Sequence, residues 1–357
     1  MKRRILITCT DLMLHQFLLP HVENLLERGW DVELACSEVG GRLAAVREAL
    51  PGVPVHTLRL RRSPLWMGNM LGFFDLKRLV AKNKYHIIWT NEPVMGVATR
   101  LAARKSGAKV LYLCHGFHFY RGGNCLNWLL FYPVEYIMSR WTDLLVTINR
   151  EDAETAKHMR SRRTAYIHGI GLDTARLDGP ASNIREELGL EKDDFLVLSV
   201  GELNKNKDHR TSLRAIAAMN DPHIHYALCG RGKLLKKLQT QANRLGIGER
   251  VHFLGYRRDL PGIYAGADLL LHPSRREGLP QAVLEGKVCG LPLVVSDIRG
   301  VRDLAEKGDI LVPPGDAAAF ARAIRQQKAH PRRCAWKGDA YCLENVKKEL
   351  ENLLESL

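Results

Sequence analysis

EGLPQAVLE, residues 277–285, followed by CGLPLVVS at residues 289–296, is the stretch that says most about this chain. Pro280 favours the first turn of a helix, because its ring fixes φ and its missing N–H is not needed there. Glu277 then lies in the loop before the helix, and Glu285 lies in its second turn. The free N–H groups and the positive dipole end of a helix N-terminus attract phosphate. The stretch therefore favours a ligand that is anionic in its middle and carries hydroxyls at both ends, which is the layout of a nucleotide-sugar.

Outward from this stretch, short apolar runs alternate with helix-period segments along the whole chain. In the first half, the runs typical of buried parallel strands are Arg4–Cys9, Val32–Cys36, Val55–Leu58, His86–Thr90, Lys109–Cys114 and Leu144–Ile148. In the second half they are Phe195–Val200, His225–Cys229, Val251–Leu254, Leu269–Leu271, Leu293–Val295 and Ile310–Val312. Strands that alternate with helices predict an α/β fold with parallel sheets and helices on both faces.

The two series of strands predict two domains. Between them, Asp173 to Asn183 is rich in Asp, Gly, Pro and Ser, a composition typical of a linker. We therefore expect an N-terminal domain over residues 1–178 and a C-terminal domain over 179–338. Leucine and valine recur at helical spacing near the end, which predicts a C-terminal helix within 339–357. This helix packs either on its own domain or back on the first, and we expect it to pack back toward the N-terminal domain.

Size and charge narrow the class of protein. The chain has 357 residues and a mass of 40.3 kDa, which is enough for two domains that each bury a core. Its formal net charge is +14, of which about +10 lies before residue 178. Such an excess favours anionic partners, such as phosphorylated ligands, an anionic membrane or nucleic acid. The basic residues are spread out and no nucleic-acid-binding motif is present, so we expect no nucleic-acid partner.

The cysteines and the N-terminus favour a reducing compartment. The 8 cysteines are scattered without CxxC pairs, and MKRR leads straight into a predicted strand without a secretory signal. No apolar run approaches the roughly 18 residues that a membrane-spanning helix needs. We therefore expect a cytosolic protein that does not span a membrane.

These motifs resemble the retaining family 4 glycosyltransferases, whose GT-B fold consists of two facing Rossmann-like domains. The family pattern E-x7-E corresponds to residues 277–285, with LHPS at 271–274 before it and GLP at 290–292 after it. HGFHFY at 115–120 and NWLL at 127–130 are most similar to bacterial capsule and biofilm exopolysaccharide transferases. The resemblance covers essentially the whole chain. It implies transfer of a hexose or N-acetylhexosamine from a UDP-sugar to a saccharide on membrane-bound polyprenyl diphosphate, in exopolysaccharide or capsule biosynthesis.

The resemblance assigns roles to the residues around the donor. Glu285 would accept hydrogen bonds from the ribose hydroxyls, because one carboxylate can accept both. Glu277 would contact the sugar ring near the reacting centre. The backbone N–H groups of Gly278 and Leu279 would lie beside the sugar and the phosphate.

The loop GELNKNK at 201–207 is the predicted phosphate loop, and it departs from the family pattern at one position. Lys207 corresponds to the family's phosphate-binding lysine, whereas Glu202 stands where relatives carry arginine. The candidates that could replace this cation are Lys205, Arg231 and a backbone N–H. Gly201 begins the loop, and Gly230 would carry a second turn near the nucleotide.

Three histidines are candidates in the N-terminal half. His115 follows the predicted strand 109–114, at the carboxyl edge where ligands bind open α/β sheets. The family places a histidine there against the donor sugar, and Gly116 permits close approach of a ligand. His118 is the competing candidate for this role. His15, in the first βα turn, is expected on the acceptor side.

The sequence offers no obvious metal site. It has no Asp-x-Asp element where a metal-dependent transferase would need one, and no His/Cys cluster with zinc spacing. We therefore expect a metal-free mechanism without a cofactor, in which protein donors stabilise the charge of the departing phosphate.

Trp128 to Met138 is apolar and aromatic except for Glu135. The arginines nearby in sequence are Arg121, Arg140, Arg160, Arg162 and Arg163. The segment is either a core helix with a solvated basic face or a surface that dips into an anionic leaflet. A lipid-linked acceptor favours the second interpretation, with the protein peripheral on the inner face of the cell membrane.

Two other functions are compatible with the same motifs. A UDP-sugar 2-epimerase shares the fold but uses no acceptor, so it would convert one sugar nucleotide into another without one. A non-catalytic scaffold subunit of polysaccharide assembly is favoured only by Glu202, since Lys207, Glu277, Glu285 and His115 match an active enzyme.

Overall fold

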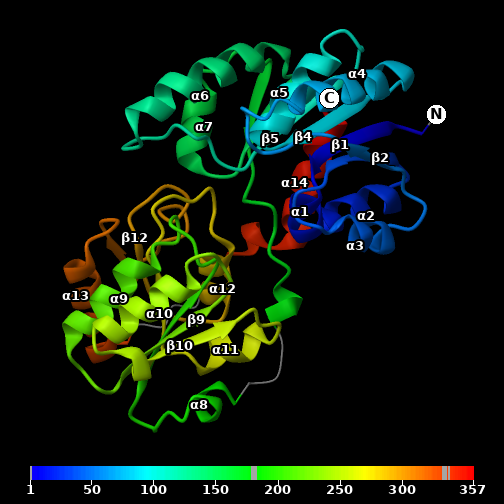
Figure 1. Cartoon of the computed structure of the whole chain (residues 1–357). Helices are drawn as coiled ribbons and strands as arrows, with labels where there is room; N and C mark the ends of the chain where they lie inside the picture. Colours follow the sequence, from blue (N-terminus) through cyan, green and yellow to red (C-terminus); the bar gives the residue numbers. More distant parts are fainter. Residues whose placement is uncertain (1, 178–182, 332–335, 337) are drawn as a thin grey trace. The chain divides into compact units, whose positions relative to one another are not determined.

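The computed structural model describes residues 2–177, 183–331, 336 and 338–357 (Figure 1). It divides into two compact units. Unit 1 runs to Gly171 and also contains Leu343–Leu357, and unit 2 spans Leu172–Cys342. The expected linker over 173–183 falls within unit 2, and residues 178–182 of it lie outside the described residues. Each unit has one parallel sheet, which confirms the predicted α/β class.

Unit 1 has a seven-stranded sheet in the order β3-β2-β1-β4-β5-β6-β7. Its strands are β1 Arg4–Thr10, β2 Asp31–Ser37, β3 Val55–Leu58, β4 Ile87–Asn91, β5 Lys109–Cys114, β6 Leu144–Thr147 and β7 Arg163–Tyr166. The six strands predicted here are all present, within one or two residues at their ends. The sequence analysis missed β7, because Arg163 and Thr164 are exposed on an edge strand and give no apolar run.

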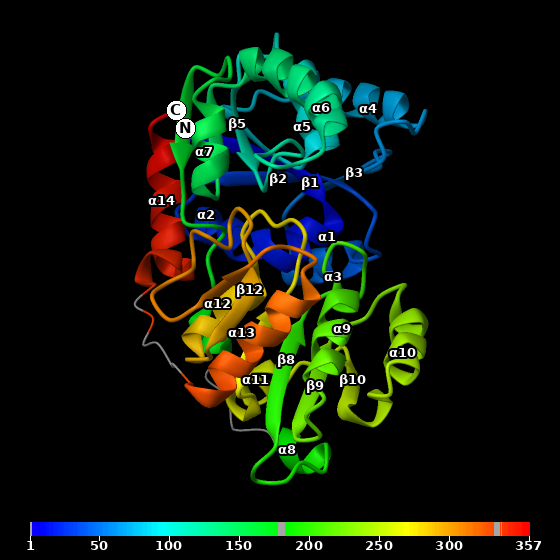
Figure 2. The ribbon, with the colours of Figure 1, turned by 90° about the vertical axis from the view of Figure 1, so that its left-hand side faces the viewer.

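Helices cover both faces of this sheet. They are α1 Asp11–Met13, α2 Leu19–Glu27, α3 Leu43–Ala49, α4 Asn69–Lys82, α5 Pro93–Ala103, α6 Cys125–Met138, α7 Arg150–Ala156 and α14 Leu343–Glu355, with a π-helical turn at Leu14–Leu18 and a 3-10 turn at Ser139–Trp141. α4, α5 and α6 form one layer, in which α5 packs against both neighbours. Figures 1 and 2 show this layer on the opposite face of the sheet from α1, α2 and α3.

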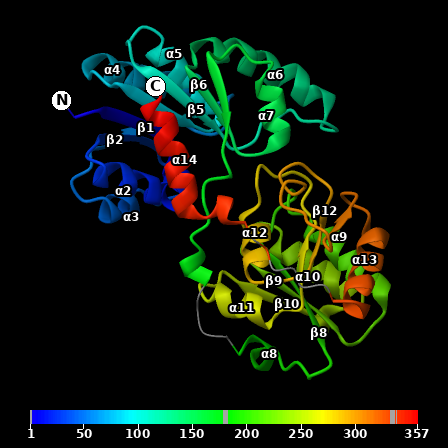
Figure 3. The same cartoon turned by 180° about the vertical axis from the view of Figure 1, so that it is seen from behind.

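The C-terminal helix α14 belongs to unit 1 and packs on α2 (Figure 3). Its apolar stripe is buried. The Glu349 carboxylate accepts hydrogen bonds from the backbone N–H and the ring Nδ1 of His168, at 3.0 and 2.7 Å. Of the two placements open to the sequence, the structure shows the helix on the N-terminal unit.

Unit 2 has a six-stranded parallel sheet in the order β10-β9-β8-β11-β12-β13. Its strands are β8 Phe195–Val200, β9 Ile224–Cys229, β10 Val251–Gly255, β11 Leu269–His272, β12 Leu293–Ser296 and β13 Ile310–Val312. α9 His209–Met219, α10 Leu235–Arg244 and α13 Ala317–Ala329 bury one core cluster with the sheet. α8 Ile184–Glu187, α11 Leu260–Gly266 and α12 Gln281–Val288 bury another. Single 3-10 turns lie at Thr174–Leu177, Gly248–Arg250 and Asp339–Tyr341.

Each sheet has one point where the strand order reverses. In unit 1 it lies between β1 and β4, and in unit 2 between β8 and β11. Ligands of open α/β sheets bind outside the carboxyl ends of the strands at such a point. The loops that follow these four strands are therefore the first places to look for a site.

Candidate functional site

The switch point of unit 2 holds a largely buried ion pair. Lys207, in the loop after β8, places its Nζ 2.7 Å from Oε1 of Glu277, in the loop after β11. The two side chains are only 20% and 13% exposed. Residues that are 70 positions apart in the sequence thus meet where the fold predicts a ligand.

Side-chain amides fix the loop that carries Lys207. Oδ1 of Asn204 accepts the backbone N–H groups of Asn206 and Lys207, both at 2.9 Å. The side-chain amide of Asn206 donates to the backbone carbonyl of Arg276 at 2.8 Å, and the backbone carbonyl of Asn206 accepts the N–H of Arg275. Asparagine closes turns of this kind by imitating a backbone group. The loops after β8 and β11 are therefore tied together independently of the ion pair.

Two glycines allow the turns after β8 and β9 to approach each other. Gly230 has a φ of +152°, and a Cβ there would lie 1.9 Å from the carbonyl oxygen of Gly201. Gly201 has a φ of +151°, and a Cβ there would lie 3.2 Å from the Lys207 side chain. Only glycine fits this backbone and this spacing. The predicted glycines thus shape the edge on which Lys207 lies.

Burial acts in opposite ways on the two glutamates of the E-x7-E pattern. For Glu277, burial would raise the pKa, but the Lys207 ammonium and the ring of His272 hold this pKa well below its usual range. For Glu285, burial raises the pKa, against a hydrogen bond that Tyr264 Oη donates to Oε2 at 2.6 Å. Glu277 is therefore always ionised near neutral pH. The hydrogen bond from Tyr264 offsets only part of the effect of burial on Glu285.

The helix α12 begins one residue later than predicted. Pro280 is its N-cap, with extended backbone, and Gln281 is its first residue. Pro280 therefore ends the preceding loop and does not occupy the first helical turn. Glu285 still lies in the second turn, so the predicted spacing of the two glutamates around the helix N-terminus is present.

The sequence analysis missed three side chains of this site. His272, at the end of β11, donates from Nε2 to Oε1 of Glu277 at 3.2 Å. Arg299 is 4% exposed and donates from Nε to the Glu277 carbonyl at 3.2 Å. Tyr264, from α11, is the partner of Glu285. The only signal for His272 was its place in LHPS, and neither Arg299 nor Tyr264 belongs to a motif.

Two of the three candidates for replacing the family arginine are side chains at the surface. Lys205 and Arg231 are exposed, and Arg231 lies over the ring of Tyr256 at 5.8 Å. Glu202 is also exposed, and its carboxylate accepts a hydrogen bond from the Asn204 amide at 3.0 Å. The glutamate thus supports the asparagine that closes the Lys207 loop.

In unit 1, His115 lies at the carboxyl end of β5, beside the end of β4. Its Nε2 is 3.0 Å from Oδ1 of Asn91. Burial, with the nearby His21, lowers the pKa of His115 to about 4, so the ring is neutral at pH 7. Because the amide oxygen can only accept, Nε2 donates and Nδ1 keeps a lone pair. Nδ1 can therefore accept a hydrogen bond from a hydroxyl group of a ligand.

The two other histidines differ in their surroundings. The ring of His118 packs on Phe131 of α6, with centroids 4.9 Å apart. His15 is half-buried in the π-helical turn after α1. His115 is thus the candidate that lies at a strand end, where Asn91 is its polar partner.

A polar network crosses the switch point of unit 1. Glu92, after β4, has a φ of +66°, which is strained for a glutamate. Its carboxylate accepts the backbone N–H of Thr10 at 2.7 Å and contacts Arg62 Nη2 at 2.7 Å. Glu92 therefore joins the ends of β1 and β4 to the loop after β3.

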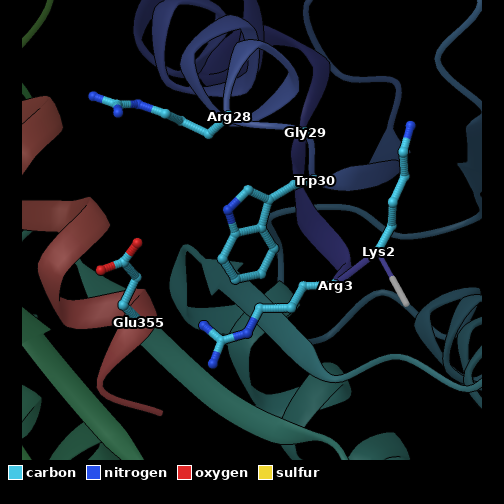
Figure 4. Close-up of a pocket in the computed structure, with 6 residues that line it drawn as sticks. All are labelled: Lys2, Arg3, Arg28, Gly29, Trp30 and Glu355. Carbon is cyan, nitrogen blue, oxygen red and sulfur yellow. The ribbon is translucent and has the colours of Figure 1, made fainter.

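A surface hollow of about 580 Å³ lies at the other edge of this sheet (Figure 4). Lys2, Arg3, Arg28, Gly29, Trp30 and Glu355 line it. These residues precede β1 and β2 or end α2 and α14, so they lie at the amino edge of the strands. None of the predicted site residues reaches this hollow.

Neither a metal cluster nor a membrane span is found in the part of the chain that the structure describes. Over these residues, no three His, Cys, Asp or Glu side chains are grouped so that they could hold a metal ion. Of the helices described, none is both long and apolar enough to cross a bilayer.

Comparison with protein families identifies the class. Residues 181–340 match the model of glycosyl transferases group 1, and residues 16–168 match the glycosyl transferase 4-like domain. The chain therefore belongs to the glycosyltransferases of this family, as the motifs predicted. It is an enzyme of the transferase class, with two Rossmann-like domains that match the GT-B fold.

Three similar proteins give this assignment detail. EpsD of Bacillus subtilis (strain 168), named as a glycosyltransferase without a stated substrate, is 37% identical over 350 residues, covering 94% of this chain and 90% of that one. An Escherichia coli UDP-Gal:alpha-D-GlcNAc-diphosphoundecaprenol alpha-1,3-galactosyltransferase is 28% identical over 319 residues, covering 86% and 82%. Alr3699/HepE of Anabaena, solved with UDP and glucose, has the same fold, with a TM-score of 0.81, 20% identity and coverage of 99% and 100%.

Proposed function

We propose that this glycosyltransferase moves a hexose or N-acetylhexosamine from a UDP-sugar to a saccharide on a polyprenyl diphosphate, with retention of the anomeric configuration. The observation that carries the proposal is the largely buried Lys207–Glu277 pair at the switch point of unit 2. The E. coli relative is named for such a donor and such a carrier lipid, which supports both halves of the reaction. A place in exopolysaccharide or capsule assembly rests on the resemblance of the motifs at residues 115–120 and 127–130.

Lys207 is proposed to stabilise the departing UDP. When the bond to the sugar breaks, the β-phosphate gains negative charge, and a cation already in place lowers the barrier most. Glu277 holds the Lys207 ammonium at 2.7 Å, so the cation needs little rearrangement. The N-terminus of α12, with Gly278 and Leu279 before it, adds backbone N–H groups and a favourable dipole.

The two glutamates are proposed to divide the donor between them. Glu285 binds the ribose hydroxyls, since Tyr264 engages its Oε2 and the carboxylate can accept further bonds. Glu277 contacts the sugar near the reacting carbon and, as a fixed anion, favours the positive charge that develops on the ring. His115 is proposed to accept a hydrogen bond from a hydroxyl of the donor sugar. His15 and His118 are proposed to lie on the side of the acceptor substrate.

Catalysis is proposed to need no metal. The support is the Lys207 ammonium, which provides the positive charge that a divalent ion would bring to the diphosphate. Transfer should therefore continue unchanged in excess chelator. Loss of transfer in chelator that returns with added magnesium or manganese would contradict this part of the proposal.

The proposal is tested first by donor binding. A screen of UDP-sugars by thermal shift should find donors that stabilise the protein in proportion to the logarithm of their concentration over Kd. Glu285→Gln should raise the donor KM by about tenfold with a smaller effect on kcat, because it loses charge-assisted bonds to the ribose. The exposed Glu249→Gln, in the same unit, is the control and should behave as wild type.

The reaction itself is tested with a polyprenyl-diphosphate-linked saccharide and each donor that binds. NMR of the product should show the anomeric configuration of the donor. The same mixture without acceptor separates the alternative, because conversion of one UDP-sugar into another would reveal an epimerase. No UDP-sugar binding at all would contradict the proposal.

A further inference from the structure

The helix α6 buries its charged residue and exposes apolar residues to water. Its one charged residue, Glu135, points inward and pairs with Arg100, whose guanidinium is fully buried and lies 2.8 Å away. Arg100 also lies over the ring of Tyr112 at 4.3 Å. Its outward face consists of exposed apolar residues at helical spacing, namely Leu126, Leu129, Leu130, Val134 and Ile137. A helix that faces water normally shows the opposite pattern.

A second apolar group projects from the same helical layer, before and at the start of α4. Its members are Leu65, Met67, Met70, Leu71 and Phe74, of which Leu65 and Met67 are 91% and 90% exposed. Hydrogen bonds hold this turn: Asn69 accepts the N–H of Arg61 and donates to the carbonyl of Ser63, both at 2.8 Å. The exposed side chains therefore sit on a defined turn.

These ten residues are called here the apolar face: Leu65, Met67, Met70, Leu71, Phe74, Leu126, Leu129, Leu130, Val134 and Ile137. α4 and α6 flank α5 in one layer, and Figures 1 and 2 both show the three helices side by side. Exposed apolar residues in such number are typical of a surface that binds a membrane or another protein.

Charge indicates which partner covers it. Residues 59–163 carry about +11 of the chain's net charge of +14, and they include all of the apolar face. Cations lie at both of its parts: Arg61 is over the ring of Trp66 at 4.6 Å, and Arg160 is over the ring of Tyr136 of α6 at 5.3 Å. Lys77 and Arg78 are exposed on α4. A second copy would bring the same positive charge against this one, and like charges oppose association. Apolar side chains rimmed by cations match an anionic lipid surface.

We propose that the apolar face inserts into the interface of an anionic membrane, with both α6 and the 65–74 turn as contact elements. The inference rests on the proposed function, because a lipid-linked acceptor must be met at the bilayer. The loop before the turn also reaches the ligand-binding edge of unit 1, where Arg62 contacts Glu92 at 2.7 Å. Docking through this turn places the membrane beside that edge.

The test is co-flotation with vesicles of phosphatidylglycerol and phosphatidylcholine. Wild type should float at about 50 mM salt and much less at about 500 mM, because screening weakens the attraction to anionic lipid. The double variants Leu65→Glu/Met67→Glu and Leu129→Glu/Leu130→Glu should each lower the bound fraction about tenfold. The control, Leu245→Glu/Leu311→Glu, makes the same charge change at exposed apolar residues of unit 2 and should float as wild type.

Three results would overturn the inference. Wild type could stay off the vesicles at low salt, or either double variant could float as wild type does. Light scattering could instead show a dimer that the double variants dissociate, which would make the face a contact between copies. Thermal shift with UDP on every variant reports folding and donor binding separately. Flotation without any UDP effect would therefore contradict the proposed function and leave the membrane contact supported.

Discussion

Lys207 and Glu277 form the contact on which the proposed chemistry depends. Lys207→Ala removes the cation and leaves the largely buried Glu277 carboxylate without its ammonium partner. We expect turnover to fall by about 10²–10³, as for loss of one preorganised donor in other enzymes. Lys205→Ala, on the exposed part of the same loop, is the control and should change turnover by less than about threefold. Steady-state kinetics with saturating donor measures both, and equal effects would contradict the assignment.

At this scale the sequence predicted part of the site and missed part of it. Glu277 and Glu285 belong to the E-x7-E pattern, and Lys207 matches the family's lysine in the loop after a predicted strand, so the resemblance selected all three. His272, Tyr264 and Arg299 come from a strand end, another helix and a distant loop. Their contacts depend on tertiary packing, and no local pattern distinguishes them from other buried polar residues.

At the scale of elements, the turns after β8 and β9 depend on Gly230. Gly230→Ala would place a Cβ 1.9 Å from the Gly201 carbonyl oxygen on a backbone with φ of +152°. We expect it to destabilise the fold by more than about 2 kcal/mol and to weaken donor binding. Gly246→Ala is a matched control, because its φ of +71° is also positive but nothing lies within 4 Å of the added Cβ. It should cost about 1 kcal/mol.

Thermal or urea unfolding compares the two glycine variants. Equal losses of stability would show that backbone conformation alone, and not the close approach of the two turns, requires glycine at 230.

The elements themselves were largely predictable. Buried parallel strands are short apolar runs, and twelve of these runs were found as strands. The edge strand β7 was missed because its first two residues, Arg163 and Thr164, are exposed and polar. The role of α6 also could not be derived from composition, since an apolar helix fits a core and a membrane surface equally well. The structure adds that Glu135 points inward and that apolar residues of α6 are exposed, and both observations support the proposed membrane contact.

For the whole molecule, buried histidines predict sensitivity to acid. Burial lowers the pKa of His21 to about 4 and that of His209 to about 3, against 6.5 in the unfolded chain. Between these values the unfolded chain binds protons that the folded chain does not. The free energy of unfolding therefore contains the full contribution of these neutral histidines above about pH 6.5. It falls as the pH is lowered towards 4, by up to about 1.4 kcal/mol per pH unit for each histidine.

Unfolding midpoints measured from pH 7.5 to 4.5 check this prediction. His21→Gln keeps a donor for the carbonyl of Ile170, which His21 Nε2 contacts at 2.8 Å, and cannot titrate. It should make the decline with falling pH less steep. His330→Gln, at an exposed position, is the control. A wild-type midpoint that does not change with pH over this range would contradict the account.

The central claim is that the carboxyl edge between β8 and β11 binds the UDP part of the donor. The most direct measurement is a crystal structure of the protein with UDP. The account predicts the ribose hydroxyls on the Glu285 carboxylate, and the phosphates between Lys207 Nζ and the N-terminus of α12. A nucleotide bound elsewhere, or one that leaves both Lys207 and Glu285 without contact, would contradict it.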